Sequence, residues 1–434
     1  MDKVKPSTLP GFMELLPEEQ ILFNKMMDII RKHYEENGFL PIDTPVLEKT
    51  EVLLAKGGGE TEKQIYRFTK GDTDMSMRFD LTVPLARYTV EHFSDLNFPF
   101  KRYQISKVYR GERAQRGRFR EFYQCDIDAI GNGKLSLVND AQMPVVICGI
   151  FKDLKLGNFK VHINNRKILK GFFENLGAKK EEEILRTIDK LDKIGMGKMV
   201  EELKDQGLKE EEIEKILEFL QIQGKNSEKI SALKSLKIEN EKFKEGIEEL
   251  SQVLEYIEAF GVSEENIEVD LKIARGLDYY TGTVYETFLT GHEDVGSVCS
   301  GGRYDNLAEY YTDLKLPGVG ISIGLSRLFF KLMEKNLIQA ENKSLVDLIV
   351  IPMEGFLTEG IRLVKTLKEK GIKAIIYSEE GKIGKKFKYA DKLNIPYSLA
   401  LGENEIKTGL YPLKNMKTSD QEELSIEEIC QKLK

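Results

Sequence analysis

The most informative pattern in the chain lies between residues 101 and 128. It contains Val108-Tyr109-Arg110-Gly111-Glu112-Arg113, and then Arg118-Phe119-Arg120-Glu121-Phe122-Tyr123-Gln124-Cys125-Asp126. Polar and apolar residues alternate on both sides of a turn with Gly111 and Gly117, which predicts a long β-hairpin. Because successive side chains of a strand point to opposite faces, Arg110 and Glu112 should share a face. The same rule groups Arg118, Arg120, Phe122 and Gln124.

This hairpin is also strongly basic. Residues 101–120 contain eight Lys or Arg residues, and Glu112 is the single acidic one, in a chain whose 65 basic and 72 acidic residues give a net charge of −7. Guanidinium groups bind phosphate oxygens in a bidentate way, and an aromatic ring on the same face can stack on a base. The pattern therefore indicates a nucleotide site. The alternative is a solvated hairpin whose charges have no function.

The composition bounds the remaining possibilities. The 434 residues are 41% hydrophobic and 32% charged, which predicts a folded protein of about three domains. The net negative charge excludes nucleic-acid binding through overall basicity but allows a local basic patch. The chain has no apolar run long enough to span a membrane, and Met1–Pro6 does not resemble a signal peptide, so we expect a cytoplasmic protein.

Common cofactor and metal motifs are missing from the sequence. The four cysteines follow no CxxC spacing and the four histidines are not clustered, so a disulfide scaffold, a zinc site and a Ser–His–Asp triad are improbable. The chain has no GxxxxGK[ST] loop, and Gly318, Gly320 and Gly324 do not have GxGxxG spacing. The scattered residues are Cys125, Cys148, Cys299, Cys430, His33, His92, His162 and His292.

Several regions surround the hairpin. Apolar spacing predicts an amphipathic helix at 18–37, further helices near 83–92 and 138–151, and strands at 65–68, 75–79 and within 267–305. Residues 168–262 carry 16 basic and 22 acidic residues with apolar residues at helical spacing, which predicts a separate helical domain. Strands and helices then alternate through residues 345–434, as in a compact α/β module.

Two glycine-containing stretches are candidate pocket walls. The first is Ala274-Arg275-Gly276-Leu277-Asp278-Tyr279-Tyr280-Thr281-Gly282, with a lone arginine between apolar strands. An ordinary strand–turn–strand with packed tyrosines explains it equally well. The second is Ser300-Gly301-Gly302-Arg303-Tyr304-Asp305, whose paired glycines suit either a close approach to a ligand or a tight turn.

Together these segments resemble the class II aminoacyl-tRNA synthetases. Residues 18–48 are similar to motif 1 of that class, residues 110–122 to motif 2 and residues 318–327 to motif 3. The stretches at 275–280 and 300–305 resemble the two signature peptides of the histidyl-tRNA synthetase family within the class. Arg78-Phe79-Asp80-Leu81-Thr82-Val83-Pro84 and Phe122–Asp126 match its eukaryotic-type members.

The resemblance implies an α+β fold: a mainly antiparallel catalytic sheet of about six strands flanked by helices, a helical insertion and a C-terminal α/β anticodon-binding domain. It implies a homodimer formed through motif 1. The catalytic core is expected in two segments, residues 1–167 with motifs 1 and 2, and residues 263–333 with the signature peptides and motif 3. The insertion (168–262) would separate them, and a linker (334–344) would lead to the anticodon-binding domain (345–434).

The implied reaction has two steps. L-Histidine attacks the α-phosphate of ATP to give histidyl-adenylate and pyrophosphate, and the histidyl group then passes to the 3′-terminal ribose of the histidine tRNA. Mg²⁺ is expected with ATP, but the sequence shows no dedicated metal site. We expect neither membrane nor DNA as a partner.

The resemblance also implies roles for particular residues. The catalytic residues would be Arg110 and Arg275, on opposite sides of the α-phosphate. ATP would be bound by Arg110, Glu112, Phe122 and Arg327. The α-ammonium group of histidine would be bound by Asp80, Thr82 and Gln124. The imidazole would be read by Asp128 and Tyr280, and the histidine pocket would also include Arg275 and Tyr279.

The sequence departs from the common family pattern at three positions. Ser326 precedes Arg327 where a glutamate is frequent, and Asp80 and Asp128 stand where many bacterial members have glutamate. Two other functions compete with synthesis of charged tRNA. One is the catalytically silent, histidine-sensing regulatory subunit of ATP phosphoribosyltransferase, and the other is a non-enzymatic RNA- or partner-binding protein. Histidine-dependent ATP–pyrophosphate exchange separates all three.

Overall fold

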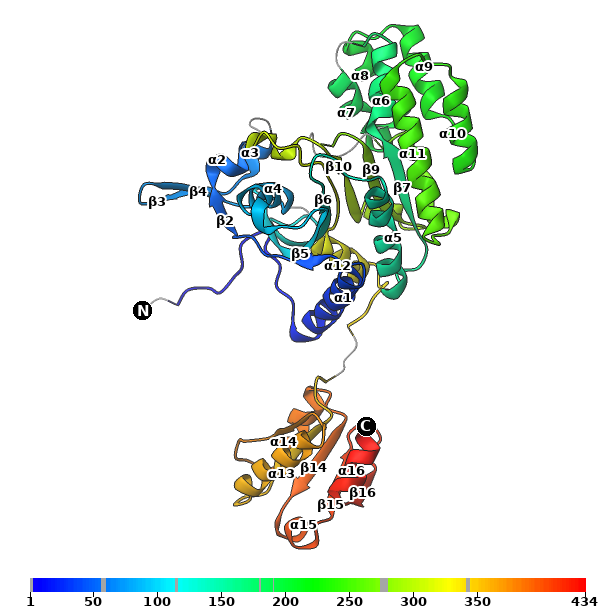
Figure 1. The fold of residues 1–434 in the computed structure, drawn as a ribbon. Coiled ribbons are helices and arrows are strands. Elements are labelled where there is room, and N and C mark those ends of the chain that lie inside the picture. The colour runs from blue at the N-terminus through cyan, green and yellow to red at the C-terminus, as the bar shows by residue number, and fades with distance from the viewer. Residues whose placement is uncertain are drawn as a thin grey trace. The chain divides into compact units, whose positions relative to one another are not determined.

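The chain divides into two compact units in the computed structural model (Figure 1). One unit holds nearly all of residues 3–339, and the other holds residues 340–434. The structure describes residues 3–55, 60–113, 116–178, 181–189, 191–273, 280–340 and 344–434. Within these ranges, every helix is too short or too polar to cross a membrane.

An eight-stranded sheet forms the centre of the first unit. Its order is β1 (Leu40–Pro41), β5 (Phe100–Tyr109), β6 (Glu121–Ile130), β11 (Gly318–Ile323), β10 (Cys299–Tyr304), β9 (Thr283–Leu289), β7 (Phe159–Asn165) and β8 (Ile267–Val269). The six strands from β5 to β7 are antiparallel, whereas β1 and β8 pair in parallel at the two edges. The predicted antiparallel sheet is confirmed, and it is wider than the expected six strands by these two short edge strands.

The predicted hairpin is present. β5 and β6 pair from Phe100↔Ile130 to Tyr109↔Glu121. The expected strand alternation at Arg110 and Glu112 and at Arg118 and Arg120 is wrong, because β5 ends at Tyr109 and β6 begins at Glu121. Backbone donors there bond to other segments: Gly111 N donates to Gln64 O at 2.6 Å, and Arg120 N donates to Gly11 O at 2.7 Å. Phe122 and Gln124 therefore share a strand face, whereas Arg110, Glu112, Arg118 and Arg120 lie in the connection.

Helices pack on one face of this sheet. They include α1 (Pro17–Glu36), α5 (Val138–Asp153) and α12 (Leu325–Glu334). The hydroxyl of Tyr34 in α1 donates to Cys125 O at 2.8 Å, and the Phe23 ring contacts the rings of Tyr123 and Phe329. Odd-numbered residues of β6 therefore face the helices. Even-numbered residues of the same strand must face the opposite side, where the candidate site lies.

Smaller elements complete the first unit. A three-stranded sheet has the order β2 (Leu47–Lys49), β4 (Thr73–Met77), β3 (Arg67–Lys70). Near it in sequence are α2 (Thr50–Leu53), α3 (Glu60–Gln64) and α4 (Thr82–Glu91). The predicted strands at 65–68 and 75–79 correspond to β3 and β4, each shifted by about two residues.

The segment between β7 and β8 is helical, as its apolar spacing predicts (Figure 1). It consists of α6 (Arg166–Asn175), α7 (Glu181–Asp189), α8 (Leu191–Asp205), α9 (Glu210–Leu220), α10 (Asn226–Ser235) and α11 (Glu241–Ala259). α11 buries Phe243, Ile247 and Leu250, and it packs against α6. These helices belong to the first compact unit. The domain boundaries at residues 168 and 262 stay a prediction.

The second unit is a five-stranded sheet with helices. The strand order is β13 (Ala374–Ile376), β12 (Leu348–Pro352), β14 (Tyr397–Leu401), β15 (Tyr411–Asn415), β16 (Gln421–Leu424). The helices are α13 (Leu357–Glu369), α14 (Ile383–Lys392), α15 (Glu403–Thr408) and α16 (Ile426–Leu433). The sequence predicts this α/β alternation correctly but misses α15, which has six residues and ends at Gly409 with φ +70.

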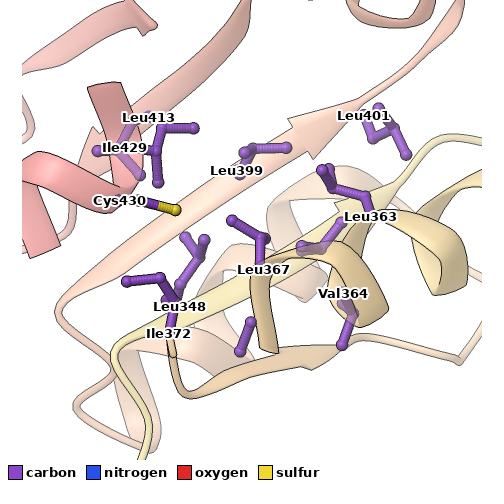
Figure 2. Packing of buried hydrophobic residues seen from close by; sticks show 12 residues of the cluster. Leu348, Leu363, Val364, Leu367, Ile372, Leu399, Leu401, Leu413, Ile429 and Cys430 are labelled. Atoms are coloured by element: carbon purple, nitrogen blue, oxygen red, sulfur yellow. The ribbon is translucent and has the colours of Figure 1, made fainter. Parts of the chain in front are cut away.

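Figure 2 shows how the second unit holds together. Leu348 of β12 and Leu399 of β14 pack with Leu367 of α13 and Ile429 of α16, and all four are fully buried. Removing one such side chain down to Ala costs about 2–5 kcal/mol. Residues far apart in sequence thus share one apolar core, as expected for an independently stable module.

Candidate active site

The register of the sheet sets side chains opposite one another on the face away from α1 and α12. Two cross-strand rows define this site face, one centred on Asp128 and one centred on Asp126. The first row is Arg102, Asp128, Gly320, Gly302. The second is Gln104, Asp126, Ser322, Ser300, Glu286. Residues of the hairpin, of the motif-3-like segment and of the second signature stretch therefore meet on one surface.

Two glycines make room on this surface. A Cβ atom at Gly320 would lie 2.0 Å from Oδ1 of Asp128, and one at Gly302 would lie 2.9 Å from Cδ1 of Tyr280. No side chain larger than hydrogen fits at either position unless these neighbours move. Gly302 lies inside strand β10, so a tight turn does not explain this glycine. The glycines instead let Asp128 and Tyr280 lie against the sheet.

A cavity of about 710 Å³ opens on the site face. It brings together all four residues expected to bind ATP, which are Arg110, Glu112, Phe122 and Arg327. The guanidinium carbon of Arg110 lies 5.1 Å from the centroid of the Phe122 ring, and its Nε donates to Phe79 O at 2.9 Å. This volume is within the range of nucleotide-sized ligand sites.

The other ATP-site residues also have protein contacts. Glu112 forms an ion pair with Arg118, and the Glu112 carbonyl accepts a hydrogen bond from Nε of Arg120 at 2.9 Å. Arg327 Nη2 donates to Val295 O at 3.0 Å. Contacts of Glu112 with Arg118 and Arg120 thus link the two sides of the connection between β5 and β6 beside the cavity.

Ser326, which replaces the frequent glutamate of motif 3, has a structural partner. Its buried hydroxyl accepts a hydrogen bond from the backbone N of Tyr123 at 2.9 Å. The bond links the first turn of α12 to β6. The resemblance to the class leaves this position without a role, and the structure gives it one in joining motif 3 to motif 2.

Buried acceptors without partners gather near Gln124. The atoms are Oδ2 of Asp80, Oε1 of Gln124 and Oδ1 of Asp126, none of which has a hydrogen-bond partner in the described part of the chain. Asp80 Oδ1 accepts from Val83 N at 3.1 Å, next to half-buried Thr82 at the start of α4. Leaving such groups unpaired is costly, so they suit a ligand that donates hydrogen bonds.

Burial shifts the acidity of this carboxyl cluster. Desolvation raises the pKa of Asp80 to about 6, and the nearby charge of Asp126 adds to the rise while Arg110 opposes it. Burial likewise raises the pKa of Asp126, against the attraction of Arg102. A bound cation would favour the ionised forms of both carboxyls.

Asp128 is held from two sides. Its Oδ2 lies 2.6 Å from Nη2 of Arg102, and its Oδ1 accepts a hydrogen bond from the Tyr304 hydroxyl at 2.7 Å. Burial raises the pKa of Asp128 to about 7, although Arg102 opposes the shift. Sequence reasoning did not single out Arg102 or Tyr304. Arg102 belongs to the basic hairpin, but its place opposite Asp128 depends on the strand register, which the sequence does not give.

The remaining predicted residues can be placed only incompletely. Arg275 and Tyr279 lie outside the described residues. Tyr280 is described and half-buried, and it packs with Phe79 and Val83 beside Gly302. The structure thus brings Asp80, Gln124, Asp128 and Tyr280 to one region.

Metal-binding side chains do not converge in the described ranges. No group of three or more His, Cys, Asp or Glu residues there could hold a metal ion. The four cysteines are free and buried, and burial raises the pKa of Cys125 well above that of an ordinary thiol.

Comparisons with known proteins agree with this arrangement. The family model described as Histidyl-tRNA synthetase matches residues 11–328, and the one described as Anticodon binding domain matches residues 347–434. The histidine–tRNA ligase of Clostridium tetani is 58% identical over 435 residues, which cover 100% of this chain and 99% of the relative. That of Finegoldia magna is 49% identical over 99% of this chain and 100% of the relative.

A solved structure gives the same result. The crystal structure of histidyl-tRNA synthetase from Nostoc sp. PCC 7120 is 40% identical, with a TM-score of 0.90, over 99% of this chain and 100% of that one. A structure from Bacillus halodurans, described as an ATP phosphoribosyltransferase regulatory subunit/histidyl-tRNA synthetase, is 22% identical with a TM-score of 0.75 and shares the fold. On the family model and the identity over the full chain, this protein belongs to the histidyl-tRNA synthetase family.

Proposed function

We propose that the protein is a histidine–tRNA ligase, which activates L-histidine with ATP and transfers the histidyl group to its tRNA. The observation that carries the proposal is the 710 Å³ cavity that gathers Arg110, Glu112, Phe122 and Arg327 beside buried, unpartnered acceptors. The full-length relatives that share its sequence bear the same activity in their names.

The first step joins the histidine carboxylate to the α-phosphorus of ATP. A bond forms from a carboxylate oxygen to that phosphorus, and the bond to the bridging oxygen breaks so that pyrophosphate leaves. Negative charge gathers on the α-phosphoryl oxygens, and we assign its stabilisation to Arg110 and Arg275. No general base is required, because the attacking carboxylate is already ionised near pH 7.

ATP binding is assigned to the residues that line the cavity. Phe122 and Arg327 would hold the adenine ring between them, and Glu112 would accept a hydrogen bond from its amino group. Mg²⁺ is expected to travel with the phosphates. Mg²⁺ that is bound with a nucleotide usually keeps several waters and takes phosphate oxygens as ligands.

Histidine recognition uses the acceptors at the other end of the site. Asp80, Thr82 and Gln124 would bind the α-ammonium group, and Asp128 and Tyr280 would bind the imidazole. A pocket that hydrogen-bonds both ring nitrogens leaves buried polar groups unpaired with any other amino acid. Discrimination of this kind reaches about 10⁴–10⁵ without an editing site.

The second unit is assigned to tRNA binding. It matches an anticodon-binding family over residues 347–434, a module that a histidine-sensing regulatory subunit does not need. Formation of a homodimer through the motif-1-like segment and a cytoplasmic location stay predictions from the family resemblance.

Histidine-dependent ATP–pyrophosphate exchange tests the first step, and charging of the histidine tRNA tests the second. We expect both activities in the purified chain. Histidine binding without exchange would instead indicate a regulatory subunit. RNA binding without either histidine binding or exchange would indicate a non-enzymatic protein.

A further inference from the structure

The Gln124 carboxamide points its nitrogen toward Ser322 and its oxygen away from it. Its Nε2 donates to Oγ of Ser322 at 3.0 Å, and its Oε1 is buried without a partner in the described ranges. A carboxamide can rotate by 180° and exchange its oxygen and nitrogen, because the two ends are similar in size. An α-ammonium group has only donors, so Gln124 can bind it in just one of the two orientations.

Ser322 lies between Gln124 and a carboxylate. In the pairing of β6 with β11, Ser322 is directly opposite Asp126, whose side chain is 3% exposed. Burial raises the pKa of Asp126, while the charge of Arg102 and the neighbouring Ser322 hydroxyl oppose the rise. Both neighbours of the Ser322 hydroxyl are therefore polar and fixed in strands.

The donors and acceptors of Asp126, Ser322 and Gln124 fix the direction of hydrogen bonding along these three residues, which we call the relay. A bound cationic ligand favours the ionised form of Asp126. An ionised carboxylate only accepts hydrogen bonds, so Ser322 then gives its one proton to Asp126. The Ser322 oxygen can then only accept from Gln124, which must present its NH₂ group. The amide oxygen of Gln124 consequently faces away from Ser322.

We infer that Asp126 and Ser322 are positioning residues that hold the Gln124 amide with its oxygen toward the α-ammonium group of histidine. The inference rests on the proposed function, which supplies the ammonium ligand. Ser322 acts on the substrate only through Gln124 in this scheme. Without the relay, Gln124 is free to present N–H groups to a cation, and such an arrangement is repulsive.

A ligand that lacks the ammonium group provides the discriminating measurement. We would compare L-histidine with 3-(imidazol-4-yl)propionate, which keeps the ring and carboxylate, as substrate and competitive inhibitor in ATP–pyrophosphate exchange. Ser322→Ala should raise the KM for histidine about five- to tenfold, the size expected for one hydrogen bond. The KM for ATP and the Ki of the propionate should stay within about twofold of wild type.

Three further variants separate positioning from damage to the fold. Ser322→Thr keeps the hydroxyl and should restore the histidine KM to within about twofold. Ser106→Ala is the matched control: Ser106 lies opposite Gln124 on β5, but its hydroxyl donates to Asp43 at 3.0 Å. This control should leave the histidine KM unchanged. In a Gln124→Ala background, Ser322→Ala should have no further effect.

Three outcomes would overturn the inference: an unchanged histidine KM in Ser322→Ala, an equal rise in the Ki of the propionate, or an effect that persists in the Gln124→Ala background. These outcomes differ from failure of the proposed function. In that case the wild-type protein itself would lack histidine-dependent exchange.

Discussion

Replacing Asp128 by Asn keeps the shape of the side chain but removes a buried negative charge. Its partner Arg102 is 0% exposed, and two of the Arg102 nitrogens, Nε and Nη1, have no partner in the described part of the chain. In the variant, the Arg102 guanidinium keeps its hydrogen bond from Nη2 to the Leu81 carbonyl, at 3.2 Å. Asn keeps one acceptor for two donors, Arg102 Nη2 and the Tyr304 hydroxyl, and it avoids the desolvation cost of the ionised carboxylate, so we expect a net cost of about 1 kcal/mol at pH 8.

The loss in free energy of unfolding caused by Asp128→Asn should increase as the pH falls. Burial raises the pKa of Asp128 to about 7, compared with about 3.9 in an unfolded chain. Between these values the folded state binds a proton that the unfolded state does not, so the wild type gains stability at lower pH. The contribution is complete below the unfolded pKa and is lost as pH rises through 7. From pH 8 to pH 6 the wild type should gain about 1.4 kcal/mol relative to Asp128→Asn.

Urea unfolding followed by tyrosine fluorescence measures these free energies, since the chain has 17 Tyr and no Trp. Asp74→Asn is the control, because its ion pair with Arg67 is exposed and the pKa of Asp74 is lowered by that partner. The control should leave the free energy of unfolding nearly unchanged at both pH values. A difference between wild type and Asp128→Asn that stays the same or shrinks from pH 8 to pH 6 would refute the reasoning. An unchanged difference would mean that Arg102 keeps Asp128 ionised at pH 6.

Four further outcomes are expected. Asp128→Asn should raise the KM for histidine far more than that for ATP, and a selective ATP defect in exchange kinetics would contradict the pocket assignment. Arg275→Ala should abolish adenylate formation while leaving histidine affinity, measured by calorimetry, largely intact; near-normal exchange would count against its role. Deleting residues 345–434 should remove tRNA charging but spare exchange, and equal loss of both would argue otherwise. Gly320→Ala would place a Cβ atom 2.0 Å from Asp128 Oδ1 and should destabilise the fold by about 1–3 kcal/mol in the same urea experiment. Gly324→Ala is its control, because a Cβ atom there has no neighbour within 4 Å, and it should cost less.

The regions of the fold that were predictable are those with local signals. The sequence shows the alternation of β5 and β6 directly, because side chains in a strand repeat every two residues. It also shows where strand β11 ends and helix α12 begins, because the apolar spacing changes near Gly324. The pairing of the edge strands β1 and β8 escaped prediction, because they have two and three residues and pair in parallel with distant segments. No local period exists over so few residues.

The site was predictable in its residue types but not in its pairings. Arg102 faces Asp128 only because the register begins at Phe100↔Ile130, and the register depends on how residues 110–120 connect the two strands. Those residues bond to Gln64 and Gly11, far away in sequence, so no pattern within the hairpin could reveal their course. Register therefore had to come from the structure.

The signature stretch around Gly302 shows the same limit in one strand. Tyr304 reaches Asp128 on the site face, whereas Arg303 forms a buried bidentate pair with Asp140 of α5, with Nε–Oδ1 and Nη2–Oδ2 distances of 3.0 and 2.5 Å. Neighbouring residues of one motif thus serve different purposes, one in the site and one in the core. Alternation in a strand requires such a division, but the letters alone do not say which residue faces which side.

The unpaired acceptors supply the strongest physical argument for where the amino acid binds. Each buried oxygen of Asp80, Gln124 and Asp126 that has no partner in the described residues carries a cost of about 1–3 kcal/mol in the free protein. A stable core would replace such groups with apolar ones, as it does around Leu367 in the second unit. The presence of these unpaired oxygens near the Arg110–Phe122 pair is explained if a cationic ligand donates hydrogen bonds to them. The same cation carries a carboxylate, and binding it there would bring that carboxylate toward the nucleotide cavity.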